Sequence, residues 1–378
     1  MAGLSIMIVT GEASGDLHGA NLAKALRALQ PEVRLVGVGG QHMRAAGVEL
    51  VQGLHRLDVV GVPGPGMMWK GLANILTLKR FFRRESLDGV VFVDNPSMNL
   101  RLARIAAKLG HRVIYYIAPQ IWAWGRHRIN LIKRVVRRMI VILPFEEPIF
   151  READVPCSFV GHPLLDHVAQ HYDAVGLRKQ LGLPAQGLIL GVLPGSRHSE
   201  IQSLLPTMLK AAGRIRESFP DLHCVIGRAP TVAEEWVNKV IDRTTLPVTV
   251  VPNQPAEVMA AADLLLVASG TATLQAALVG TPMILAYRVS RLTYLLARML
   301  ITVEHVGLVN LVAGRGIVPE LLQSEMTAER LSQEALHLLK DRTRYAQMRA
   351  ALGGIRVRLG SPGASLRAAE VVLTECQA

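Results

Sequence analysis

Short apolar runs alternate with segments of helical periodicity along most of the chain. Residues 5–10 and 89–93 form apolar runs of strand length, and residues 17–29 place Leu22 and Leu26 on one helical face. Strands that alternate with helices in this way predict a parallel sheet covered by helices on both faces.

The alternation is interrupted over residues 156–184, where Gly and Pro occur without a long apolar run, and it restarts at Leu188. We therefore predict an α/β protein of two doubly wound, Rossmann-like domains that face a central crevice. The expected divisions are an N-terminal domain over 1–163, a linker over 164–187, a C-terminal domain over 188–345 and C-terminal helices over 346–378. A return of these last helices to the N-terminal domain is one option.

One apolar run of the C-terminal half ends at the small-residue turn SGTAT and is followed at once by a helix-compatible segment. The first N–H groups of such a helix have no partner inside it, and the helix dipole also favours an anion there. Ser269, Thr271 and Thr273 add hydroxyl donors beside Gly270 and Ala272. Taken alone, the turn fits a well-capped helix without a ligand equally well.

A second turn of this kind follows the apolar run 188–194. Gly195 allows a close backbone approach to a ligand, Ser196 can cap the next helix, and Arg197 offers a planar pair of donors suited to phosphate. Two such turns in one half of the chain predict one nucleotide diphosphate held from two sides. The N-terminal turn at 11–16 lacks the dinucleotide-binding spacing, and no Walker lysine is present, which disfavours dehydrogenases and NTPases.

Net charge and composition limit the classes of molecule that the protein is expected to bind. The 42 Lys and Arg against 30 Asp and Glu leave a formal charge of +12, which indicates an anionic partner: a phosphorylated substrate, a membrane surface or a nucleic acid. Aromatic residues make up only 4% of the chain, which disfavours base-stacking platforms, and no nucleic-acid motif is present. The three cysteines have neither a metal spacing nor a disulfide framework, so we expect a cytoplasmic protein.

No run of the chain reaches the ~18 uncharged apolar residues that a membrane span requires. The segment 59–70 is nevertheless apolar, contains Met67, Met68 and Trp69, and leads toward the basic sequence KRFFRR at 79–84. This pattern favours an interfacial anchor on anionic lipid, with the methionines in an adaptable acyl-binding loop of poor helical order. A core helix with a solvated basic end is the competing interpretation.

Seven motifs occur in a fixed order and cover nearly the whole chain. They are GEASGD (11–16), PQIWAW (119–124), LPFE (143–146), FVGHP (159–163), LPGSR (193–197), SGTAT (269–273) and NLVAG (310–314). With these motifs the chain resembles the lipid A disaccharide synthase family, bacterial inverting glycosyltransferases with the two-domain GT-B fold.

The resemblance implies that UDP-2,3-diacylglucosamine donates its sugar to 2,3-diacylglucosamine 1-phosphate, giving a β-1,6-linked disaccharide 1-phosphate and UDP. It implies no cofactor and no metal, so amides and basic side chains must stabilise the leaving diphosphate. It also implies peripheral association with the anionic surface of the inner membrane. A homodimer remains an open alternative.

The resemblance also distributes roles over the motifs. Donor-binding residues are those of the two turns, together with a second set: Gln275, Arg288 and Asn310, although Asn310 is equally suited to ordering its loop. The turn at 11–16 and the segment at 94–99 would contact the acceptor. The residues expected to do so form a third set: Glu12, Ser14, Gly15, Asp16 and Asn99. Glu12 and Asp16 are also suited to bracing the first turn.

Two positions depart from the family pattern. The family carries Asp-x-Pro-Asp-Phe-Asn where this chain has DNPSMN at 94–99, so Ser97 replaces the second Asp. A hydroxyl cannot act as a general base near pH 7, and either Asp94 or His18 must then take that role. Gln275 replaces a Glu, and its carbonyl can still accept a ribose hydrogen bond.

These departures keep two alternatives open. One is a related UDP-sugar glycosyltransferase or epimerase with another substrate. The other is a non-catalytic glycolipid-binding paralogue that keeps the scaffold without the reaction.

Overall fold

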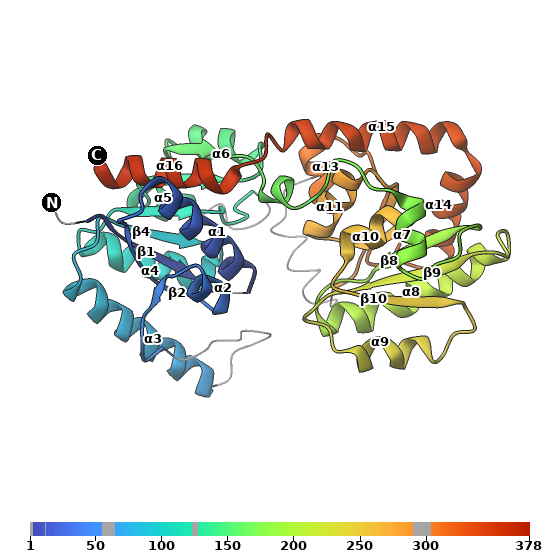
Figure 1. The fold of residues 1–378 in the computed structure, drawn as a ribbon, viewed down its shortest axis with the longest axis horizontal. Coiled ribbons are helices and arrows are strands. Elements are labelled where there is room, and N and C mark those ends of the chain that lie inside the picture. Colours follow the sequence, from blue (N-terminus) through green and yellow to red (C-terminus); the bar gives the residue numbers. More distant parts are fainter. Residues whose placement is uncertain (1–2, 12, 55–64, 123–127, 290–303) are drawn as a thin grey trace. The chain divides into compact units, whose positions relative to one another are not determined.

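Two parallel sheets, each formed by a separate part of the chain, make up the fold (Figure 1). The computed structural model describes residues 3–11, 13–54, 65–122, 128–289 and 304–378. One unit comprises residues 1–163 together with 360–378, and the other comprises residues 164–359.

The first unit contains a seven-stranded sheet in the order β3-β2-β1-β4-β5-β6-β7, with every pairing parallel. Its strands are β1 (Ser5–Thr10), β2 (Arg34–Val38), β3 (Glu49–Leu50), β4 (Gly89–Val93), β5 (Val113–Tyr116), β6 (Arg138–Val141) and β7 (Cys157–Phe159). Its helices are α1 (Ala13–Leu29), α2 (Gln41–Ala45), α3 (Pro65–Arg84), α4 (Pro96–Lys108), α5 (Ile129–Val135), α6 (Glu146–Glu152) and α16 (Ala364–Gln377).

Helices cover both faces of this sheet, because its central strands are apolar on both sides. Helices α3, α4 and α5 share one apolar core with alternate residues of the strands, among them Val90 and Phe92. Helices α1 and α16 pack against each other on the other side, so the end of the chain lies beside its beginning (Figure 1). Glu375 of α16 anchors this return through ion pairs with Arg137 (2.7 Å) and Arg138 (2.8 Å).

The second unit contains a six-stranded parallel sheet in the order β10-β9-β8-β11-β12-β13. Its strands are β8 (Ile189–Leu193), β9 (His223–Arg228), β10 (Val248–Pro252), β11 (Leu264–Ala268), β12 (Met283–Tyr287) and β13 (Glu320–Leu322). Its helices are α7 (Ala174–Gln180), α8 (His198–Arg216), α9 (Glu234–Ile241), α10 (Pro255–Ala261), α11 (Thr271–Val279), α13 (Leu308–Ala313), α14 (Ala328–Lys340) and α15 (Arg342–Arg358).

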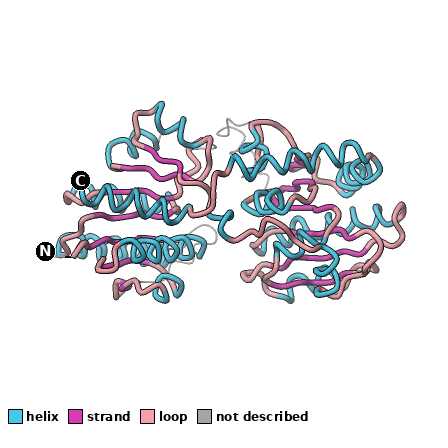
Figure 2. The backbone as a smooth tube through the Cα atoms, turned by 45° about the horizontal axis from the view of Figure 1, so that its top comes forward, coloured by secondary structure: helices cyan, strands magenta, loops and turns pink. Residues whose placement is uncertain are grey.

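In both units the strands run between helical segments, as Figure 2 shows, and the predicted α/β class with two doubly wound, Rossmann-like domains is confirmed. A short 3-10 helix, Pro163–Asp166, lies where the first unit passes into the second.

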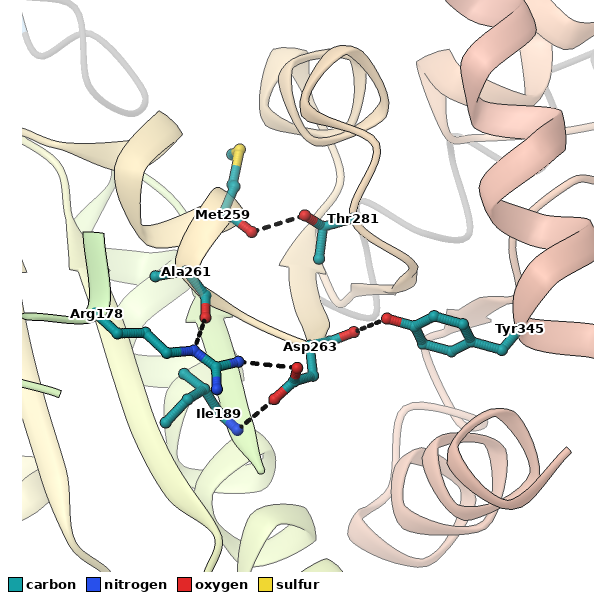
Figure 3. A network of polar contacts seen from close by, with 7 residues as sticks. All are labelled: Arg178, Ile189, Met259, Ala261, Asp263, Thr281 and Tyr345. Carbon is teal, nitrogen blue, oxygen red and sulfur yellow. Dashed lines mark hydrogen bonds and ion pairs between the residues drawn. The ribbon is translucent and has the colours of Figure 1, made fainter. Parts of the chain in front are cut away.

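The segment 164–187, expected as a linker, is part of the second unit and contains α7. Figure 3 shows what holds it there: Arg178 donates to the backbone oxygen of Ala261 (2.9 Å) and pairs with Asp263 (2.8 Å). Asp263 also accepts the amide of Ile189 (2.8 Å), and its backbone oxygen accepts the hydroxyl of Tyr345 (2.7 Å). Asp263 thus joins the amino ends of β8 and β11 to α7 through its carboxylate and to α15 through its backbone oxygen.

The helices expected together over 346–378 belong to different units. Helix α15 lies in the second unit, and α16 packs in the first. Gly360 and Gly363, which separate these two helices, adopt positive φ values of 93° and 91°. This backbone conformation ends α15 and lets the chain change direction before α16 begins.

The expected loop around Met67, Met68 and Trp69 is wrong, because all three belong to helix α3. Pro65 occupies the first helical position, where its missing N–H costs no hydrogen bond. Farther along, Leu78 and Phe82 repeat at helical spacing and are fully buried, so tertiary packing stabilises the helix.

Replacing Asp263 by Asn should lower the free energy of unfolding by about 1–3 kcal/mol, because it removes the charge that faces Arg178 and weakens the side-chain contacts with Arg178 and with the amide of Ile189. Urea denaturation followed by circular dichroism measures the change. Asp242→Asn, at the exposed end of α9, is the matched control and should lie within about 0.5 kcal/mol of the wild type. Equal midpoints for the two variants would contradict a stabilising role for Asp263.

Candidate functional site

Each sheet reverses its strand order at one point, between β1 and β4 in the first unit and between β8 and β11 in the second. Ligands of open α/β sheets bind beyond the carboxyl ends of the strands at such a reversal. The loops that follow these four strands are therefore the candidate functional site of each unit.

In the second unit, strand pairing brings together the two turns that the sequence singled out. Leu193 of β8 lies opposite Val267 of β11, so the turns that begin at Pro194 and Ser269 leave the sheet side by side. Gly270 has a φ of 150° and precedes α11, whose first amides have no acceptor within the helix. Thr271 at the start of α11 is exposed, as a ligand-binding hydroxyl must be.

The turn at Gly195 differs from the expectation, because its amides already have an acceptor. The Glu200 carboxylate accepts the N–H of Ser196 (2.8 Å) and of Arg197 (3.2 Å). Gly195 makes room for this carboxylate: a Cβ there would lie 2.2 Å from Glu200 Oε2. The close backbone approach thus serves Glu200, and what the turn presents is the guanidinium of Arg197, which is 66% exposed and paired with Glu200 at 3.2 Å.

Several other predicted donor-binding side chains are engaged in holding loops. Thr273 is fully buried and donates to the backbone oxygen of Gly270 (2.8 Å), and Ser269 donates to Val306 (3.4 Å). Arg288 donates to the backbone oxygen of Met326. Ala272 and Gln275 are half-buried on α11.

Asn310 has no hydrogen-bonding capacity left for a nucleotide. Its amide nitrogen donates to the backbone oxygen of Val318 (3.0 Å) and to Glu320 (2.7 Å). Its side-chain oxygen accepts the amides of Ile317 (2.8 Å) and Val318 (3.1 Å). The residue is 1% exposed, and the loop-ordering role is the one that its contacts support.

In the first unit, Asp94 follows β4 in a strained turn. Asp94 and Asn95 both adopt left-handed conformations, with φ of 51° and 43°. The backbone oxygen of Asp94 accepts the side-chain amide of Asn99 (2.8 Å) and the hydroxyl of Tyr115 (2.7 Å), which hold the turn in place. Asn99 is fully buried, so it supports this turn instead of facing an acceptor, and Ser97 is exposed.

The first turn, after β1, contacts the Asp94 turn directly. A Cβ on Gly11 would lie 2.1 Å from the side-chain nitrogen of Asn95, so only glycine allows this approach. Asp16 is buried and accepts hydrogen bonds from the amides of Gly40 (2.6 Å), His42 (3.0 Å) and Met43 (3.2 Å). Its carboxylate therefore stabilises the amino end of α2. The other residues predicted in this turn differ in accessibility: Ser14 is exposed, Gly15 is buried and Glu12 lies outside the described residues.

Glu146, at the start of α6 after β6, is a site residue that the sequence did not single out. Its carboxyl is 2% exposed and accepts the indole N–H of Trp122 (3.2 Å) and the amide of Leu143 (3.2 Å). Burial raises the pKa of Glu146 to about 8 in spite of these donors, and the charge of Asp94 contributes to the rise. Glu146 is therefore a neutral acid near Asp94 at pH 7.

His162, which follows β7, is a second such residue. The pKa of its imidazole is lowered to about 3, mainly by burial and in addition by the nearby charge of His18 on α1. Neither Glu146 nor His162 is suited to accept a proton at neutral pH, since one already holds a proton and the other binds one too weakly. Only their motifs, LPFE and FVGHP, signalled these residues in the sequence, and burial decides their charge.

Helix α3 presents an apolar row to the outside at its beginning. Trp69 is 74% exposed, and Leu72 and Leu76 are about half exposed at the same helical face. The side chains of Met67 and Met68 lie outside the described positions. None of the described helices is long and apolar enough to cross a membrane.

Comparison with known proteins points to one family. The family model for lipid-A-disaccharide synthetase matches residues 6–364. The lipid-A-disaccharide synthase of Syntrophus aciditrophicus is 43% identical over 371 residues, covering 98% of this chain and 97% of the relative. That of Geobacter metallireducens is 41% identical over 372 residues, covering 97% and 96%. UDP-GlcNAc 2-epimerase from Neisseria meningitidis has a TM-score of 0.64 at 12% identity, covering 98% of this chain and all of that one, which shows a shared fold alone.

The buried carboxyl of Glu146 predicts a pH-dependent stability. Its pKa is about 8 in the folded chain and near 4.5 when unfolded, so between these values the unfolded chain releases a proton that the folded chain retains. Stability should fall by on the order of 1 kcal/mol per pH unit from pH ~5 to ~8 and level off above. Glu146→Gln keeps an acceptor for Trp122 but cannot ionise, so this part of the slope should disappear.

Melting temperatures measured by circular dichroism across this pH range test the prediction. Glu152→Gln, at the exposed end of the same helix, is the control and should follow the wild-type curve. A Glu146→Gln curve parallel to the wild type would show that Glu146 is already ionised in the folded chain.

Proposed function

The chain belongs to the lipid-A-disaccharide synthetase family, and from that premise we propose how its residues carry out the reaction. It is a glycosyltransferase of lipid A disaccharide synthesis, with a UDP-sugar donor and a lipid acceptor. We propose UDP-2,3-diacylglucosamine as the donor and 2,3-diacylglucosamine 1-phosphate, lipid X, as the acceptor. The products are the β-1,6-linked disaccharide 1-phosphate and UDP.

On the donor side, the second unit stabilises the leaving diphosphate. Its oxygens accept hydrogen bonds from the first amides of α11 and from the Thr271 hydroxyl, and the Arg197 guanidinium neutralises charge. This division of roles is supported by the paired turns at the β8–β11 reversal and by the exposed guanidinium of Arg197. Ser269, Thr273 and Asn310 then act by keeping the two loops in shape.

On the acceptor side, Asp94 is the general base. Its carboxylate takes the proton of the acceptor 6-hydroxyl, the oxygen attacks the sugar C1 from the opposite face, and the C1–O bond breaks with its electron pair going to UDP. The observation that carries this assignment is the Asp94 turn: a strained turn at the β1–β4 reversal, beside the neutral Glu146. Ser97 is exposed nearby and can hydrogen-bond to the acceptor without serving as base.

The membrane partner is an anionic bilayer surface, reached through α3. Trp69, Leu72 and Leu76 occur at positions i, i+3 and i+7 and form an exposed apolar row, while Arg80, Arg83 and Arg84 follow toward the end of the helix. An apolar row with a basic end suits a helix that lies in the bilayer interface. The protein would thus act at the cytoplasmic side of the inner membrane, where acylated substrates reside.

Release of UDP from the two proposed substrates tests the reaction. Asp94→Asn should lower kcat by about 10²–10⁴-fold, because the amide cannot accept the proton. Ser97→Ala is the control and should retain kcat within a few-fold, and melting curves establish that both variants fold. Full activity of Asp94→Asn would show that Asp94 is not the general base and would favour His18 for that role. An inactive wild type with activity gained in Ser97→Asp would instead support the non-catalytic paralogue.

Vesicle flotation tests the apolar row. Trp69→Glu with Leu72→Glu should weaken binding to anionic vesicles at least ~100-fold, because each side chain loses roughly 1.5–3 kcal/mol of burial in lipid. Val175→Glu with Val357→Glu is the matched control, since these side chains are 75% and 81% exposed in the other unit. Equal vesicle binding of the two double variants would contradict membrane binding through α3.

A further inference from the structure

Three adjacent helices of the first unit contain no carboxylate side chains. Helices α3, α4 and α5 cover the same face of the sheet, where α3 contacts α4 and α4 contacts α5. Together these helices contain ten Lys or Arg and no Asp or Glu. Helix α16, on the opposite side of the sheet, carries Glu370 and Glu375 in addition to Arg367. The three helices therefore contribute only positive side-chain charge to their face of the sheet.

A groove between α4 and α5 gathers three of these cations. It has a volume of about 360 Å³ and is lined by Arg104, Lys108 and Arg134, with Ala107, Leu131 and Val135 supplying its apolar wall. Arg104 and Lys108 stand four positions apart on α4, where like charges repel each other. The three cationic side chains are exposed to solvent.

These cations differ from their neighbours in having no acidic partner. In the described part of the chain, no ion pair joins Arg104, Lys108 or Arg134 to a carboxylate. The next residue along α5, Lys133, is paired with Asp154 at 2.9 Å. Three unpaired cations around a partly apolar groove are complementary to a phosphate that is attached to an apolar body.

We propose that this groove binds the phosphate of an anionic phospholipid headgroup in the bilayer surface, an inference that rests on the proposed membrane association. The guanidinium groups and the ammonium group contact the phosphate oxygens, and the wall of Ala107, Leu131 and Val135 contacts the glycerol end of the acyl chains. Helix α4, which forms one side of the groove, also packs against α3, the helix that carries the exposed row of Trp69, Leu72 and Leu76.

The two contacts have different physical characters. The apolar row of α3 gains free energy from burial in hydrocarbon and is indifferent to the headgroup. The groove gains free energy of binding from electrostatic attraction, so it distinguishes anionic from zwitterionic lipid. Its binding weakens as salt screens the charges. Two separated contacts also fix the face of α3, α4 and α5 against the bilayer, which a single helix would not do.

The test compares binding to vesicles of phosphatidylcholine alone with binding to vesicles that contain about 25 mol % phosphatidylglycerol. The triple variant Arg104→Gln, Lys108→Gln, Arg134→Gln should bind the anionic vesicles about 100-fold more weakly, since each cation near the surface contributes about fivefold. Its binding to phosphatidylcholine should be unchanged. The control variant Lys24→Gln, Arg44→Gln, Lys239→Gln removes the same charge from exposed positions of α1, α2 and α9.

Equal losses in the groove variant and the control would overturn the proposal, because net charge alone would then explain the attraction. An unchanged affinity of the groove variant would overturn it as well. Glycerol 3-phosphate at constant ionic strength should not displace the wild type from anionic vesicles, and displacement would mean that the groove serves a small soluble phosphate instead.

UDP release from detergent-dispersed substrates separates this inference from the proposed function. The groove variant should release UDP at the wild-type rate there, since its three residues lie outside the reacting groups. A wild type that binds anionic vesicles through the groove without releasing UDP would refute the proposed reaction and leave the lipid site standing.

Discussion

Both candidate sites owe their arrangement to the pairing of parallel strands at the two order reversals. Because β1 pairs with β4 and β8 pairs with β11, the loops after these strands leave each sheet side by side. Every functional side chain considered above in the second unit's turns, and Asp94 in the first, is placed by that pairing. The apolar strands that make it possible are buried on both faces, so the site loops are carried by the most rigid part of each unit.

Around these loops, polar side chains form hydrogen bonds with backbone groups of the turns. Asn99 holds the Asp94 turn, Asp16 closes the start of α2, and Asn310 with Glu320 orders the loop before and after α13. Glu200 does the same for the turn at Gly195. A strained backbone persists only when its surroundings over-determine it, and the contacts of Asn99 and Tyr115 supply that support for Asp94. The side chains left to act on a ligand are correspondingly few.

The charges of the first unit are divided between its interior and its surface. In the interior, burial keeps Glu146 and His162 neutral, and the charge of Asp94 adds to the rise in the pKa of Glu146. On the surface, cations accumulate on α3, α4 and α5, helices that contain no Asp or Glu of their own. Both arrangements follow from dielectric environment: a lone buried charge is costly, whereas an exposed cation is solvated until an anionic surface replaces its water.

The α/β class, the positions of most strands and the two small-residue turns could be predicted from the amino-acid sequence, because hydrophobic periodicity and Gly, Ser and Thr at strand ends are local signals. Family motifs added Asp94, Arg197 and the SGTAT turn as candidates. Three features could not be predicted in this way: Glu200 accepts the amides beside Gly195, Asn310 and Thr273 face inward, and residues 164–187 pack into the second unit. Those outcomes, and the raised pKa of Glu146, depend on burial and on partners distant in the chain, which no local pattern encodes.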